Sequence, residues 1–194
     1  MGRKSLAKER KNDLLDAFER CILKYGLEGT TLEQIAQEAE MTRSIIRHYI
    51  GNRDDLVDAL IQRVISQYIE QLETQYEAIP DDNYIEYMLD DMFGKKDAMN
   101  QRDSIIIGVL MTAKNRYPHA KKMLVEMFEA IIQSVAKDLG KHYKKASKDR
   151  RYQVAYALIC LSEMHESFMW LGLRQRHYKD ARVIAETLLK TLEL

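Results

Sequence analysis

One stretch of the chain constrains its fold more than any other. It spans residues 30–60 and reads TTLEQIAQEAEMTRSIIRHYIGNRDDLVDAL. Its apolar residues recur at intervals of three and four, which places them on one face of a helix. The stretch predicts two short helices, a tight turn between them at Glu40-Met41, and a third, longer helix that follows at once. Two helices joined by so short a turn form a helix-turn-helix motif.

Local capping residues mark the start of each of these helices. Thr31 can cap the first helix, and Gln34, three residues on, completes a capping box. Thr42 stands at the N-cap of the second helix. Asn52 caps the third, where Asp55 puts a carboxylate in the positive first turn. In a helix-turn-helix the second helix enters the DNA major groove, so the motif predicts a DNA-binding domain.

The stretch resembles the DNA-binding segment of the tetracycline-repressor (TetR) family. The resemblance extends from about Tyr25 to Leu60 and is carried by Gly29, Thr30, Thr31, Ile35, Ala36, Thr42, Ile46, Tyr49, Asn52, Arg53 and Leu56. At the turn, where the family usually has Gly, this chain has Glu40. It has Arg47-His48 where the family usually has an aromatic residue, and Ile50 where Phe is common. We expect the fold to survive these departures and the base preference to be unusual.

The rest of the chain is also predicted to be helical. Its 194 residues include two prolines and eight glycines, too few for a loop-rich all-β protein. We expect an all-α fold of about nine helices. A three-helix helix-turn-helix domain is predicted over residues 1–53, and a C-terminal helical domain for effector binding and dimerisation over residues 54–194. Outside the motif, helices are predicted at about 6–25, 53–77, 82–92, 104–116, 118–140, 148–172 and 179–192.

Positive charge gathers at two places near the N-terminus, although the net charge of the chain is zero. Residues 1–12 contain five Lys/Arg and only Glu9 as an acid, and residues 41–53 contain three arginines and no acid. A charge cluster alone is commonly a solvated face. Because these two coincide with a helix-turn-helix, we expect them to meet DNA phosphates.

The second helix of the motif is interpreted residue by residue. Ile46 and Ile50 are four apart and face inward, so Ser44 and His48 face outward with Arg43 and Arg47 beside them. Arginine can bond guanine O6 and N7 together, so we expect Arg47 at a base edge and Arg43 at a base or phosphate. The resemblance implies DNA contacts for Tyr49 and a phosphate contact for Arg53. The predicted DNA-binding residues are Thr31, Thr42, Arg43, Ser44, Ile45, Arg47, His48, Tyr49 and Arg53. The alternative is that the two arginines are merely solvated and Ile45 packs within the domain.

The C-terminal part is rich in methionine and aromatic residues, which suit permissive binding surfaces. Members of the family carry an effector pocket in this domain, so the resemblance implies one here. The candidate lining residues are Tyr84, Tyr87, Met88, Met92, Met111, Met127, Phe128, Glu163, Glu166 and Trp170. They favour an apolar or lipophilic effector, and Glu163 and Glu166 a cationic one. The alternatives are ordinary core packing for the methionines and a solvated helix face for the two acids.

The last two helices carry apolar stripes that predict a dimer interface. The candidate residues are Leu161, Phe168, Ile184, Leu188 and Leu192. A helix pair from each chain would form a four-helix bundle. A monomer can also bury such stripes internally, so here the prediction depends on the resemblance.

Several other functions find no support in the sequence. Cys21 and Cys160 stand alone, His165-Glu166 lacks the four-residue spacing of two metal ligands on one helical face, and there is no glycine-rich phosphate loop. We expect no catalysis, no cofactor and no metal. No apolar run approaches the ~20 residues that a membrane span needs, and a cytoplasmic protein is expected. The combined interpretation is a homodimeric repressor that a small molecule releases from a palindromic operator in double-stranded DNA. The alternatives are a ligand-independent DNA-binding member, an activator, or a helical interaction scaffold with a vestigial helix-turn-helix.

Overall fold

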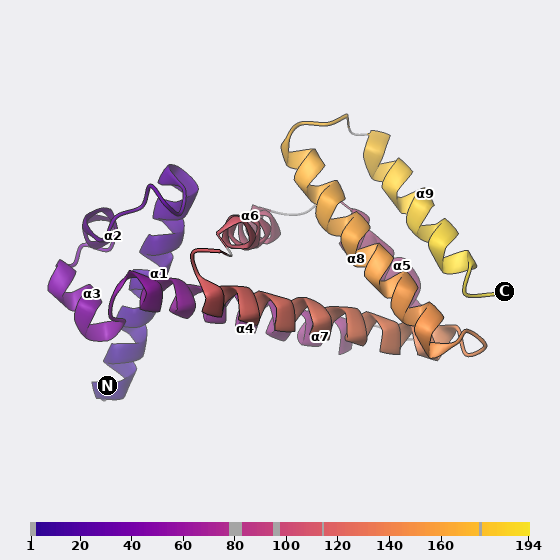
Figure 1. Cartoon of the computed structure of the whole chain (residues 1–194), viewed down its shortest axis with the longest axis horizontal. Coiled ribbons are helices and arrows are strands. Elements are labelled where there is room, and N and C mark those ends of the chain that lie inside the picture. The colour runs from indigo at the N-terminus through magenta and orange to yellow at the C-terminus, as the bar shows by residue number, and fades with distance from the viewer. Residues whose placement is uncertain (1–2, 78–82, 95–97, 114, 175) are drawn as a thin grey trace. The chain divides into compact units, whose positions relative to one another are not determined.

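The computed structural model describes residues 3–77, 83–94, 98–113, 115–174 and 176–194 (Figure 1). The chain divides into two compact units. Unit 1 comprises residues 1–72 and 97–125, and unit 2 comprises residues 73–96 and 126–194. Unit 1 therefore extends beyond the helix-turn-helix segment and includes chain from the middle of the sequence. The functional boundary predicted after residue 53 stays a prediction.

Nine α-helices and no strand occur in the described residues, which confirms the all-α prediction. Their bounds are α1 Arg3–Tyr25, α2 Leu32–Glu38, α3 Arg43–Tyr49, α4 Arg53–Glu77, α5 Tyr84–Phe93, α6 Ala98–Thr112, α7 Pro118–His142, α8 Lys148–Trp170 and α9 Arg176–Lys190. The main differences from the predicted ranges are at α6 and α9. Ser104, expected to cap α6, lies inside that helix, which begins at Ala98. Apolar periodicity fixes a helix's existence better than its ends.

Unit 1 is built around one apolar core. It contains α1, α2, α3, α6, most of α4 and the first turns of α7, and α1 contacts α2, α3 and α6. Figure 1 shows α2 and α3 as two short helices joined by a tight turn beside α1. The largest fully buried side chains are Leu14, Phe18, Ile35, Ile46, Leu56, Leu60, Ile61, Ile106 and Leu110. Ile46 anchors α3 to this core, so the opposite face of α3 is left for solvent.

Two of the three predicted caps in the motif form as expected. The Gln34 backbone N–H donates to Thr31 Oγ1 at 3.2 Å, and the Thr31 N–H donates to Gln34 Oε1 at 2.7 Å, which completes the capping box. Asn52 Oδ1 accepts from the backbone N–H of Asp55 at 3.1 Å. Thr42 occupies the N-cap of α3 but makes no side-chain capping bond there.

The turn of the motif carries a non-glycine residue in a left-handed conformation. Glu40 has φ +52°, its N–H donates to Gln37 O, and the Met41 N–H donates to Ala36 O at 2.8 Å. This pattern is a Schellman motif, whose left-handed position is usually Gly. The departure from Gly noted in the sequence therefore coincides with a real conformational cost.

Replacing Glu40 with Gly is expected to raise the free energy of unfolding by about 0.5–1 kcal/mol, because Gly adopts the left-handed conformation without steric cost. Urea unfolding of the full chain measures the change. The matched control is Gln37→Gly, which adds a glycine inside α2 and should destabilise by about 1 kcal/mol. A destabilising Glu40→Gly would contradict this account of the turn.

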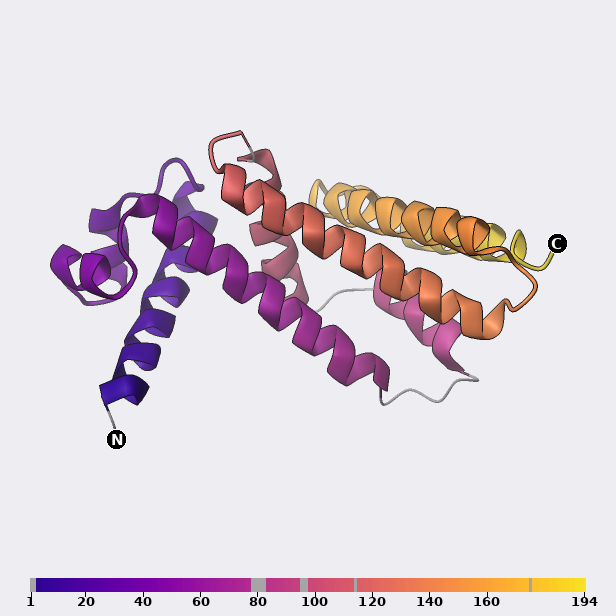
Figure 2. The same cartoon turned by 60° about the horizontal axis from the view of Figure 1, so that its bottom comes forward.

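Unit 2 contains α5, α8, α9 and the larger part of α7. Helices α5, α8 and α9 contact one another pairwise, and α8 and α9 run side by side (Figure 2). Its buried apolar side chains include Met88, Leu139, Ala155, Leu158, Ala185 and Leu189. Arg182 connects α9 to α5 by ion pairs with Glu86, at 2.6 Å, and with Asp90. Ser162 Oγ donates to Met92 O at 3.2 Å, which satisfies a buried hydroxyl.

Candidate nucleic-acid interface

The outer face of α3 presents polar and charged side chains to solvent. Arg43, Ser44, Arg47 and His48 are exposed, whereas Ile45 and Tyr49 are half-buried and Ile46 is fully buried. The His48 and Tyr49 rings meet edge to face with centroids 4.9 Å apart. The helix thus exposes two guanidinium groups, a hydroxyl and an imidazole. This inventory matches the donors used to read base edges and phosphates.

The hydroxyl groups predicted to meet phosphates make local hydrogen bonds. Thr31 Oγ1 donates to Gln34 Oε1 at 2.9 Å, and the Thr42 and Ser44 hydroxyls lie 2.8 Å apart. All three residues are exposed. Weak, exposed hydrogen bonds of this kind exchange readily for bonds to another acceptor. Their predicted DNA contacts stay predictions.

Arg43, the first residue of α3, pairs with Glu33 of α2. Arg43 Nη1 donates to Glu33 Oε2 at 3.2 Å, with 53% of the Arg43 side chain and 73% of the Glu33 side chain exposed. Glu33 was not singled out in the sequence, because the helix-turn-helix pattern does not specify acids on α2. The pair puts one negative charge beside the predicted contact surface.

Arg53 is held by groups of its own unit. Its Nε donates to Tyr117 Oη at 3.1 Å, and its two terminal nitrogens donate to the carbonyl oxygens of Thr30 and Leu27. The guanidinium thereby links the α1–α2 loop, the start of α4 and the residue preceding α7. All three nitrogens are engaged in these bonds, so Arg53 also holds unit 1 together, and its predicted phosphate contact stays a prediction.

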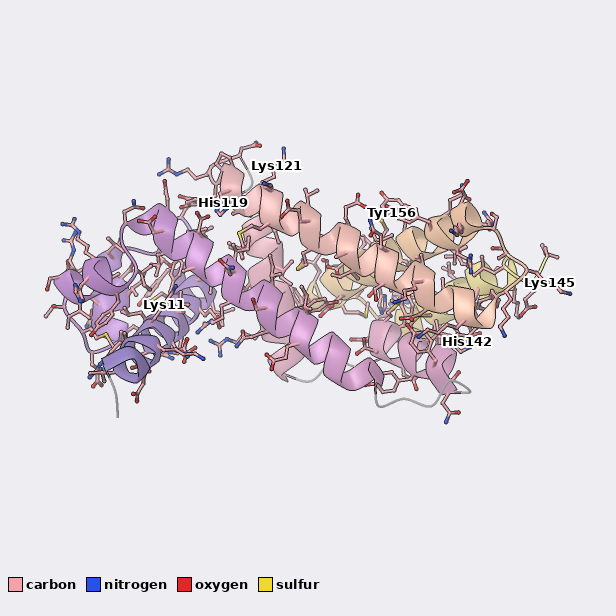
Figure 3. All side chains as sticks on the ribbon, turned by 90° about the horizontal axis from the view of Figure 1, so that it is seen from below. Lys11, His119, Lys121, His142, Lys145 and Tyr156 are labelled. Atoms are coloured by element: carbon pink, nitrogen blue, oxygen red, sulfur yellow. The ribbon has the colours of Figure 1, made fainter. Side chains whose placement is uncertain are left out.

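Basic residues also line the N-terminal part of α1. Lys8, Arg10 and Lys11 are exposed, and Lys11 is labelled in Figure 3. The N-terminal flank is helical from Arg3 onward, three residues earlier than predicted, so these side chains project from a helix. Residues 1–2 lie outside the described residues.

The ten candidate effector residues are divided between the two units. Met111 belongs to unit 1 and the other nine to unit 2. Tyr84, Met88, Met92 and Met127 are buried, Phe128, Glu163 and Glu166 are half-buried, and Tyr87, Met111 and Trp170 are exposed.

The Tyr84 hydroxyl donates to Asp138 Oδ2 at 3.0 Å. Burial, followed by the charge of Asp138, raises the pKa of Tyr84. Its ring stacks on His142, which is labelled in Figure 3. Burial fits core packing and pocket lining equally, so these effector contacts stay predictions.

One polar residue of unit 2 was passed over in the candidate set. His165 is buried on α8 between the rings of Phe93 and Tyr178, with centroid distances of 6.2 and 5.0 Å. Its Nε2 has no hydrogen-bond partner among the described side chains and backbone. Burial, followed by the charge of His177, lowers the pKa of His165 and favours the neutral imidazole. The signal in the sequence that could have identified His165 is its position as a polar residue among Leu161, Met164 and Phe168.

The candidate dimer residues differ in exposure. Phe168 and Ile184 are exposed, Leu161 and Leu188 are half-buried, and Leu192 is only 2% exposed. Leu192 therefore packs inside its own chain, and we drop it from the candidate interface. A longer exposed row runs along α8 at intervals of four residues: Tyr152, Tyr156, Cys160, Met164 and Phe168. Tyr156 is labelled in Figure 3.

No helix in the described part of the chain combines the length and apolar character required of a membrane span. Among the described side chains, no three His, Cys, Asp or Glu residues gather as a metal-binding group.

Comparison with known sequences identifies the N-terminal segment. A family model of bacterial regulatory proteins of the tetR family matches residues 14–60. The HTH-type transcriptional regulator BetI of Burkholderia thailandensis is 41% identical over 56 residues, and BetI of Burkholderia cenocepacia (strain HI2424) matches equally. Each match covers 29% of this chain and 29% of the relative, so the similarity spans less than a third of either protein.

Solved structures match over nearly the whole chain but at low sequence identity. A TetR transcription regulator from Haloarcula marismortui has a TM-score of 0.79 at 13% identity, covering 95% of this chain and 98% of that chain. A transcriptional regulator from Saccharomonospora viridis, solved in complex with choline, has a TM-score of 0.79 at 13% identity, covering 94% and 96%. At this identity the likeness establishes the shared fold.

These matches are to transcriptional regulators rather than enzymes. Residues 14–60 therefore match the helix-turn-helix DNA-binding segment of the tetR family, and the chain shares the fold of solved tetR-family regulators.

Proposed function

We propose that this protein is a homodimeric repressor of the tetR family that binds a palindromic operator and leaves it when a small-molecule effector binds. The observation that carries the DNA-binding half is the exposure of Arg43, Ser44, Arg47 and His48 on α3 while Ile46 is fully buried. We assign residues 1–53 to DNA binding and residues 54–194 to effector binding and dimerisation. Because its operator is DNA, we place the protein in the cytoplasm.

The proposed DNA contacts combine base reading and phosphate binding. Arg47 is placed at a base edge, and Thr31, Thr42, Ser44, His48 and Tyr49 at phosphates or neighbouring bases. Ile45 is half-buried, which leaves part of its side chain for a thymine methyl group. The exposed bases Lys8, Arg10 and Lys11 of α1 add phosphate contacts without sequence information.

Arg47→Ala is expected to weaken operator binding by about 1–3 kcal/mol per half-site and to relax the preference at one base pair of each half-site. The operator is first selected by the full chain from a pool of random duplexes, and binding is then measured by gel shift over a salt series. Lys11→Ala is the matched control, and it should weaken binding to all sequences alike and lower the salt slope. Unchanged selectivity of Arg47→Ala would remove Arg47 from base reading.

The proposed dimer uses the exposed apolar faces of α8 and α9. Tyr152, Tyr156, Met164 and Phe168 form a row on α8, and Val183 and Ile184 are exposed on α9. An apolar row of this length on a water-soluble regulator suits burial against a second copy. A helix pair from each chain gives a four-helix bundle around a twofold axis, which matches the symmetry of a palindromic operator.

The proposed effector is an apolar or lipophilic molecule, and a cationic one is favoured. Support comes from the methionine and aromatic residues of unit 2 and from the half-buried acids Glu163 and Glu166. The choline bound by the Saccharomonospora viridis regulator adds support for a quaternary ammonium group, which aromatic rings recognise. Releasing DNA 100-fold requires a difference in effector binding of about 2.7 kcal/mol between the two states.

The overall proposal is tested by selecting DNA with the full chain and then adding candidate effectors. A selected palindrome bound by a dimer supports the repressor assignment, whereas failure to enrich any sequence would favour the interaction-scaffold alternative. Choline and lipophilic quaternary ammonium ions are then tested for a rise in melting temperature and for release of the selected duplex. Release by neutral apolar molecules but by none of these cations would contradict the preference for a cationic effector.

A further inference from the structure

We infer that Glu33 is a positioning residue for Arg43, holding its guanidinium so that it reads a guanine in the major groove. The inference rests on the DNA binding proposed above and adds a residue to it, because Glu33 lies on α2 and not on the recognition helix. It also fixes the role of Arg43 as a base-reading residue. Arg43 is the first residue of α3, and the N-terminal residues of a recognition helix are those that reach base edges.

The geometry of the ion pair leaves the reading edge of Arg43 open. Glu33 Oε2 accepts a single hydrogen bond, from Nη1, at 3.2 Å. A guanidinium has five N–H donors, so the edge formed by Nε and Nη2 stays available as a parallel fork. That fork matches O6 and N7 of guanine. The carboxylate therefore fixes the side chain from behind without consuming the donors that recognise the base.

Exposure determines what the pair contributes. With more than half of each side chain exposed, the ion pair adds little to folding stability. Its effect is on the mobility of the Arg43 side chain. Without Glu33, the long Arg43 side chain would be free to turn towards any nearby phosphate, and phosphate contacts form with operator and non-operator DNA alike. The carboxylate thus favours the directional contact over the non-directional one.

Glu33→Gln is expected to lower the ratio of operator to scrambled-duplex affinity about tenfold for the dimer, as each half-site loses a factor of about three. The probes are a duplex selected by the wild-type full chain and a scrambled duplex of the same length and composition. Selection from the random pool should show that Glu33→Gln and Arg43→Ala relax the preference at the same base pair. The melting temperature of Glu33→Gln should stay within about 1–2 °C of the wild type, since the pair is exposed.

Two controls separate positioning from a general charge effect. Glu38→Gln removes the other pairing acid of α2, whose partner Arg20 lies on α1 at 2.6 Å, and it should leave the base preference unchanged. In the Arg43→Ala background, Glu33→Gln should cause no further loss of selectivity. The inference is overturned if Glu33→Gln retains the wild-type preference, or if Glu38→Gln relaxes it equally. If the wild-type chain enriches no sequence, the proposed function fails as well; if it enriches one that Glu33→Gln reads equally well, this inference alone fails.

Discussion

Replacing Glu19 with Gln is expected to lower the free energy of unfolding by about 3–5 kcal/mol, because it removes the buried carboxylate that faces two arginines and leaves the nearly buried Arg63 with only the exposed Asp16 as a charged partner. Only 7% of the Glu19 side chain is exposed. One carboxylate oxygen pairs with Arg63 of α4, and the other lies 2.5 Å from Arg102 Nη2 of α6. The carboxylate therefore joins three helices of unit 1, and the amide that replaces it carries no charge for either guanidinium.

A second ion pair of Arg63 supplies the control for the Glu19 substitution. Asp16 also pairs with Arg63, at 2.7 Å, but 53% of its side chain is exposed. Asp16→Asn should therefore cost no more than about 1 kcal/mol, since water replaces the lost interaction. Denaturant unfolding of both variants measures the difference. Equal effects of the two substitutions would show that burial does not set the strength of this cluster.

Short-range features were the most predictable part of the fold. The capping boxes at Thr31 and Asn52 form because both partners lie within one helical turn, so their sequence spacing fixes their geometry. The long helices α4 and α7 likewise begin within a residue of their predicted starts, at Arg53 and Pro118. Thr42 shows the limit of such rules: its position was right, but its hydroxyl pairs with Ser44 instead of capping the helix.

Long-range polar contacts could not be predicted from spacing. Arg63 pairs with Glu19, 44 residues away, and no periodicity relates the two. Arg53 resembled a phosphate contact because its position in the motif was visible, whereas its partner Tyr117 lies 64 residues further on. The pair of Glu33 and Arg43 joins two helices of the motif, but its formation depends on how the turn at Glu40 orients them. These contacts are tertiary, and they decide which charges remain free for DNA.

Apolar periodicity had a similar limit in α9 and the residues after it. Ile184, Leu188 and Leu192 recur every four residues, yet Ile184 is 51% exposed and Leu192 is 2% exposed. Leu192 lies beyond the end of α9 at Lys190, so the four-residue helical spacing does not fix the side on which it packs. The pattern indicates an apolar face, and only tertiary packing shows which part of that face is left for a partner.

The combined substitution Phe168→Glu and Ile184→Glu is expected to convert the proposed dimer to monomers and to weaken operator binding at least 100-fold, since a second tethered half-site commonly adds a factor of 10²–10⁴ in affinity. Both side chains are exposed in the single chain, so the introduced charges should destabilise the proposed dimer interface and leave the fold of the protomer unchanged. Light scattering gives the mass in solution, and gel shifts with the selected palindrome give the affinity.

Val125→Glu is the matched control for this substitution. Val125 is also an exposed apolar residue, but it lies on α7 in unit 1, outside the proposed interface. This variant should stay dimeric and bind the operator normally. The melting temperature of the double variant, measured at low protein concentration, should match that of the wild type if the protomer fold is intact. Because Glu at both positions would place four carboxylates in a small apolar interface, a double variant that still scatters as a dimer would show that the chains associate through another surface.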